Sequence, residues 1–99
     1  MSALGIAASG MRSAELRLAV SAHNVANWTT PSFRPLRADQ SSVAGGGSAV
    51  EVRQLADPEE VDLARELIDQ ILARVQFQAS AGVFATAAEI RGTLLDLRV

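Results

Sequence analysis

Residues 57–99 read DPEEVDLARELIDQILARVQFQASAGVFATAAEIRGTLLDLRV, the longest helical pattern in the chain. Asp57 can cap free amides at a helix start, Pro58 suits the first helical position, and Glu60 can complete a capping box. No proline follows, and apolar residues recur at helical spacing to the end. The pattern predicts one helix over 57–99, about 60 Å long at roughly 1.5 Å per residue. A helix of this length exceeds what so small a domain normally contains, so we expect it to work as a rod.

A second helical pattern covers residues 3–27, where apolar residues alternate in steps of four and three. This heptad seam is typical of a helix that lies along another helix at a shallow angle. Interior glycines such as Gly10 and Gly82 indicate close helix approach, or helices that are weak until a partner packs on them. The predicted packing residues are Leu4, Ala8, Met11, Leu18 and Val25 on the first helix and Ile68, Leu72, Val75, Phe77, Val83, Phe84, Ile90, Leu94 and Leu97 on the second.

The segment between the helices, residues 28–56, is predicted to be a loop with a short β segment. Residues 41–48 have the Gly/Ser composition of a flexible linker, and residues 49–55 alternate apolar and polar side chains as a strand does. This strand would pair with residues 33–38 and lie against a helix. The predicted fold is therefore a single, mainly all-α domain over residues 1–99: two long antiparallel helices in a coiled-coil hairpin, joined by a loop or short β-hairpin.

Composition narrows the function classes. The net charge is −2 with acids and bases interspersed, which leaves no basic patch for nucleic acid. The chain has no cysteine, and no apolar run approaches the roughly 20 residues that cross a bilayer. The N-terminus lacks a basic segment followed by an apolar core, so we expect no cleaved secretory signal and no membrane insertion.

No arrangement of residues indicates catalysis. The single histidine, His23, stands at the end of the first predicted helix, where it can interact with helix carbonyls. The acids of the last helix alternate with arginines and are typical of a solvated outer face. The three glycines at 45–47 lack the Lys-Ser/Thr sequence of a phosphate-binding loop. We expect no enzyme, no cofactor and no metal site.

Helix lengths point to a partner. The first helix, at roughly 37 Å, can cover little more than half of the last one. The last helix also carries a second apolar line that includes Phe77, Phe84 and Leu95. One partner helix cannot cover both lines, so we expect further copies or other proteins to bury the rest, as a homo- or hetero-oligomer.

The two ends of the chain resemble the bacterial flagellar rod and hook protein family. The N-terminal resemblance lies in residues 2–11 (SALGIAASGM) and 20–27 (VSAHNVAN), followed by the turn sequence TPSFR at 30–34. The C-terminal resemblance lies in VDL at 61–63, ELI at 66–68, QFQASA at 76–81, AAEI at 87–90 and TLLDL at 93–97. The residues that match the family's turn motif are Asn24, Asn27, Thr30, Pro31 and Phe33.

The resemblance implies a structural subunit of the flagellar basal-body rod, most like a small proximal-rod protein with a shortened central region. Such proteins are exported by the flagellar type III apparatus without signal cleavage, and assemble with themselves and other rod proteins in the periplasm. Ser32 departs from the family pattern, which has glycine at this turn. The short middle leaves an alternative open: a soluble helical-hairpin adaptor or regulator that self-associates as a helical bundle.

Overall fold

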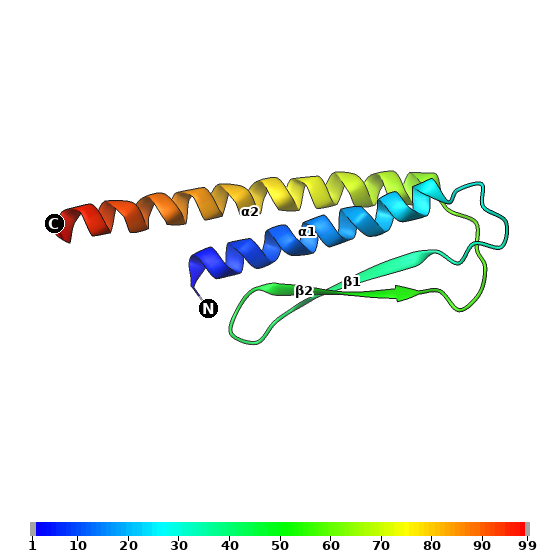
Figure 1. Cartoon of the computed structure of the whole chain (residues 1–99), viewed down its shortest axis with the longest axis horizontal. Coiled ribbons are helices and arrows are strands. Elements are labelled where there is room, and N and C mark those ends of the chain that lie inside the picture. Colours follow the sequence, from blue (N-terminus) through cyan, green and yellow to red (C-terminus); the bar gives the residue numbers. More distant parts are fainter. Residues whose placement is uncertain (1, 99) are drawn as a thin grey trace.

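The computed structural model describes residues 2–98, which form two helices and two strands. In chain order these are α1 (Ala3–Ala26), β1 (Leu36–Ser42), β2 (Ser48–Gln54) and α2 (Leu63–Arg98). The antiparallel helices and the strands stack in three layers, with α1 between α2 and the strands (Figure 1). The molecule is an elongated body of 63 × 24 × 15 Å.

The predicted mainly all-α class is wrong, because the middle of the chain builds a two-stranded antiparallel sheet beside the helices. The chain has a mixed fold of α-helices and β-strands, not two helices forming a coiled-coil hairpin. A two-stranded sheet is marginal alone, and this one is supported by packing along α1. The error came from β1, whose mostly polar sequence lacks the alternation that identifies a strand.

The strands pair in one register over all seven residues of each. Their outer face carries a 2.7 Å ion pair between Arg53 and Asp39. Their inner face meets α1, where the hydroxyls of Ser13 and Ser48 share a 2.8 Å hydrogen bond and the Ser48 amide donates to Ser9 Oγ at 3.1 Å. These polar contacts fix the sheet to the side of α1 that faces away from α2.

The linker predicted at residues 41–48 is shorter than expected, since its first two residues and its last belong to the strands. The remaining five residues form the hairpin turn, in which the Val43 amide donates to the Gly47 carbonyl at 3.0 Å. Gly45, Gly46 and Gly47 all have positive φ. Glycine adopts this conformation without steric cost, so the Gly-rich stretch forms a defined turn.

Helix α1 has clear stop and start signals. The Ser2 hydroxyl accepts a 3.1 Å bond from the Gly5 amide at its beginning. At its end the Asn27 amide donates to helix carbonyls, and Pro31 keeps the preceding residue out of the helical region. The observed helix Ala3–Ala26 ends one residue before the predicted one.

Helix α2 begins at Leu63, so the predicted start at residue 57 is wrong. The segment before it, between β2 and α2, runs beside the residues that precede β1. Its Glu59 amide donates to the Phe33 carbonyl at 3.1 Å. That bond holds residue 59 beside residue 33, and no helical turn forms where the capping box was expected. Instead, the Asp62 carboxylate accepts a 3.2 Å bond from an amide of the first helical turn.

The C-terminal part of α2 extends past the start of α1 (Figure 1). Gly10 lies against Ser80 in the antiparallel pair, which places Ala3 opposite residue 87. Every residue from Ala88 to Arg98 is exposed. We call this segment the overhang.

Candidate assembly surface

The helices bury small and polar side chains against each other. On α1 the contact follows Ala7, Ala14 and Ser21 at seven-residue intervals, and on α2 Glu66 and Ala73 repeat at the same interval. All five residues are at most 5% exposed. A seven-residue repeat keeps one face of a helix turned toward a neighbouring helix, and small residues let the backbones come close. Close approach, not large apolar side chains, therefore joins the two helices.

Gly10 marks a tight point in this contact. A Cβ at this position would collide with the side chain of Ser80. The Gly10 carbonyl also accepts a 3.1 Å bond from the Gln76 side chain, which accepts a 2.6 Å bond from Arg17. Close packing explains this glycine, whereas Gly82 has open space around it.

Asn24 connects three elements through one buried side chain. Its Nδ2 donates to the Leu36 carbonyl at 2.9 Å and to Glu66 Oε1 at 3.0 Å, while its Oδ1 accepts from the Leu36 amide at 2.8 Å. Next to it, Ser21 Oγ donates to the Glu66 carbonyl at 3.0 Å and accepts from Gln70 at 3.1 Å. The first strand and both helices are thereby held in one register.

The turn motif forms the end of α1 and the loop after it. Asn27 donates to the His23 carbonyl at 2.9 Å and accepts from the Thr30 hydroxyl at 3.1 Å. The rings of His23 and Phe33 lie 5.6 Å apart, and Ser32 has a φ of 55°. Of the predicted motif residues, Asn27, Thr30, Pro31 and Phe33 line one hollow at this end of the molecule, whereas Asn24 belongs to the buried network.

The heptad seam predicted between the helices lies mostly outside their contact. The small residues and the Asn24 network set the rotation of each helix and turn larger side chains outward. Whether these side chains join subunits stays a prediction. The half-buried members are Leu4, Ala8 and Met11, and the exposed members are Leu18, Val25, Ile68, Leu72, Val75, Phe77, Val83, Phe84, Ile90, Leu94 and Leu97.

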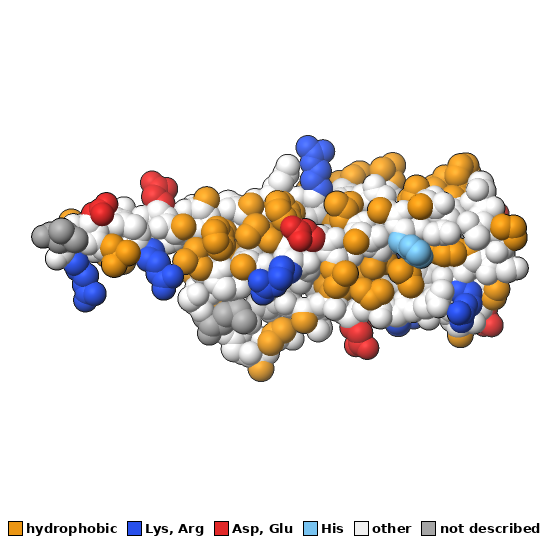
Figure 2. Space-filling model, viewed as in Figure 1, with side chains coloured by type: hydrophobic (Ala, Val, Ile, Leu, Met, Phe, Trp, Pro, Cys, Tyr) orange, Lys and Arg blue, Asp and Glu red, His pale blue; other side chains and the backbone are white. Residues whose placement is uncertain are grey.

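A groove runs between the helices on the side of α1 that the sheet leaves open. It measures about 700 Å³, and its apolar lining includes Leu18 from α1 with Leu67, Ile71 and Phe77 from α2. Charged groups stand at its edges. Hydrophobic side chains gather along the visible parts of both helices with few charges between them (Figure 2). We call this feature the apolar groove.

The signal for this arrangement was present in the sequence as seven-residue lines of Ala, Ser and Gly. Sequence reasoning followed the larger side chains instead and missed Ser21, Glu66 and Gln70. The partner of a buried carboxylate cannot be read from a sequence, because Asn24 and Glu66 stand 42 residues apart.

Neither a metal-binding cluster nor a membrane-spanning helix is found among the described residues. Residues 2–98 contain no group of three or more His, Cys, Asp or Glu that could hold a metal ion. Within the same residues, neither helix is long and apolar enough to cross a membrane. No protein-family model matches the chain, and no curated protein matches it either.

Proposed function

We propose that this chain is a structural subunit of the bacterial flagellar basal-body rod and assembles through its terminal helices. The resemblance at both chain ends supports the proposal. In the structure, the N-terminal motif forms α1 and its closing turn, and the segments of the C-terminal motif are spread along α2. Its partners would be further copies, other rod proteins and the flagellar type III export apparatus, and its place would be the periplasmic rod.

The observation that carries the proposal is the distribution of apolar side chains around α2. The side opposite α1 carries Ile68, Leu72 and Val75, each more than half exposed. The apolar groove lies beside this side, next to α1, and is lined by Leu67 and Phe77. Leaving such side chains in water forfeits roughly 1.5–3 kcal/mol for each that could be fully buried.

Two exposed faces favour an open assembly over a closed pair. A two-copy bundle would cover one face of α2 and leave the other in water. A helical assembly built from heterologous contacts gives each subunit neighbours on several sides. The rod subunit therefore accounts for both faces, whereas a dimeric adaptor accounts for one.

Deleting the gene in the bacterium that encodes this chain tests the proposal. Cells should lose complete basal bodies and swimming, and a tagged copy should label the rod in purified basal bodies. Intact rods and normal motility in the deletion strain would contradict the proposal. A fixed dimer with both helices fully protected from amide exchange would favour the adaptor instead.

A further inference from the structure

We propose that copies of the chain join head to tail, with the overhang of one copy docked as a helix in the apolar groove of the next. The guest helix runs parallel to α2 of its host. This inference rests on the proposed function, since it names the contact through which the subunit polymerises. The contact is tested with purified protein, so the result does not depend on the gene deletion that tests the rod function.

We call one line of exposed apolar side chains on the overhang the docking stripe. Ile90, Leu94 and Leu97 stand at positions i, i+4 and i+7, which is the spacing by which an amphipathic helix enters a groove. Their exposed fractions are 56%, 58% and 78%. No other described element lies beside this part of α2 (Figure 1). The stripe is therefore free to meet a second copy.

The groove has the dimensions that the overhang needs. Its α2 wall is lined from Leu67 to Gln78, which is about 17 Å of helix. The overhang, Ala88–Arg98, is about 16 Å long at the same rise. The guest stripe can thus run along the whole groove and reach its apolar lining.

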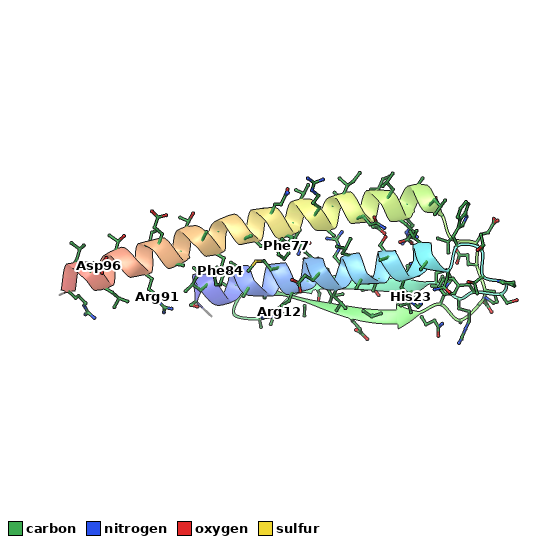
Figure 3. The ribbon with its side chains drawn as sticks, turned by 45° about the horizontal axis from the view of Figure 1, so that its top comes forward. Arg12, His23, Phe77, Phe84, Arg91 and Asp96 are labelled. Atoms are coloured by element: carbon green, nitrogen blue, oxygen red, sulfur yellow. The ribbon has the colours of Figure 1, made fainter. Side chains whose placement is uncertain are left out.

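The two edges of the docking stripe have opposite charge. Arg91 and Arg98 stand seven residues apart on one edge, and Glu89 and Asp96 stand seven apart on the other. Arg91 and Asp96 project from the overhang with no neighbouring element beside them (Figure 3). A partner groove should therefore present an acidic wall on one side and a basic wall on the other.

The apolar groove has such walls, with Glu15 on α1 and Arg74 on α2. Guest arginines then face Glu15 and guest acids face Arg74. For right-handed helices this match is obtained when the guest lies parallel to host α2; the reverse direction puts like charges together. Charge pairing selects the direction here more than it adds affinity.

A parallel contact of this kind does not close on itself. Each copy presents one groove and one overhang, so every added subunit leaves a new groove and a new overhang free. Aligning the middle of the overhang with the middle of the groove shifts neighbours by about 21 residues of helix, or roughly 30 Å. The apolar side of α2 that faces away from α1 stays available for other neighbours.

Mixing two full-length variants tests the contact. Leu94→Glu removes the docking stripe and Ile71→Glu removes the groove, so each should remain a 10.4 kDa monomer in light scattering while the wild-type chain assembles. An equimolar mixture should give a 1:1 dimer and nothing larger, because one intact overhang meets one intact groove. Circular dichroism should show unchanged helix content in both.

The matched control is Leu95→Glu. Leu95 is next to Leu94 and equally exposed at 58%, but it lies on the other side of the helix. This variant should assemble like the wild type. Equal loss of assembly in both variants would overturn the docking stripe. Wild-type chains that stay monomeric, or Leu94→Glu chains that still dimerise through groove-to-groove contact, would overturn the inference.

The cysteine-free chain allows the direction to be measured. Ile90→Cys should form a disulfide with Ile71→Cys on another copy, and Leu97→Cys with Gln78→Cys. Preferred pairing of Ile90→Cys with Gln78→Cys would overturn the parallel direction. The results can tell this inference from the proposed function. If the purified chain assembles head to tail but the deletion strain builds normal rods, the docking contact is supported and the rod function is rejected. If the tagged chain labels rods but Leu94→Glu assembles as fully as the wild type, the rod function is supported and the docking contact is rejected.

Discussion

The two sides of α2 differ in the side chains that they carry. On the side that meets α1, Glu66 and Ala73 are buried, whereas Ile68 and Val75 on the opposite side are more than half exposed. An amphipathic helix on the surface of a globular protein shows the reverse order, with its apolar stripe inside. Small and polar groups therefore join the two helices, while many of the large apolar side chains are left exposed.

A polar interior favours one register. Large aliphatic side chains can repack when one helix slides along another. The hydrogen bonds of Asn24 to Leu36 and Glu66 can form in only one alignment of the helices and the strand. Buried polar groups are known to specify register in helix pairs. A fixed register keeps the length of the overhang constant from copy to copy.

Asn24→Ala should produce the largest loss of stability. The variant leaves the Leu36 amide and carbonyl and the Glu66 carboxylate without the partner that each has now. Unpaired buried groups cost about 1–3 kcal/mol each before relaxation, so the free energy of unfolding should fall by about 3 kcal/mol. Urea unfolding followed by circular dichroism measures it.

Asn27→Ala is the control, because the hydrogen bonds of Asn27 are exposed to solvent. Its loss should stay below about 1 kcal/mol. If the two variants were equally stable, the Asn24 network would not be what fixes the interior of the helix pair.

Ala73→Leu should follow, with a loss of about 2 kcal/mol from overpacking the helix contact. Ala73 is 1% exposed, and three more carbon atoms would push the helices apart. Leu72→Ala, one residue away on the exposed side, should change the free energy of unfolding by less than about 0.5 kcal/mol. A larger loss from Leu72→Ala than from Ala73→Leu would reverse the assignment of inside and outside.

Local signals in the sequence were enough to place α1 and the turn that follows it. Ser2 and Pro31 act within a few residues, so their effects can be read directly. The predicted start of α2 was wrong because the Glu59 amide bonds the Phe33 carbonyl, 26 residues away, instead of taking part in a capping box. The strand expected at residues 49–55 is present as β2, but most of β1 was missed for the same reason, since β1 is specified by its partner strand and by α1 more than by its own composition.

The candidate surface was partly predictable. The surplus length of α2 and its second apolar line follow from counting residues, and both are present as the overhang and the exposed faces. Which stripe faces α1 could not be predicted, because burial normally follows hydrophobicity and here follows size. Ala14 and Ala73 carry a weaker signal than Leu18 or Leu72, although they form the contact.

Ser32→Gly should give the smallest of these effects and raise stability. Ser32 has a φ of 55°, a conformation that costs an L-residue about 1–2 kcal/mol and glycine almost nothing. Part of the gain is offset by the greater freedom of glycine in the unfolded chain, so we expect a gain of about 0.5–1 kcal/mol. Ser41→Gly, inside β1, should instead lose about 0.5–1 kcal/mol. A loss in both variants would show that the turn relaxes in solution, and the loop end of the helix pair would then be softer than its polar interior.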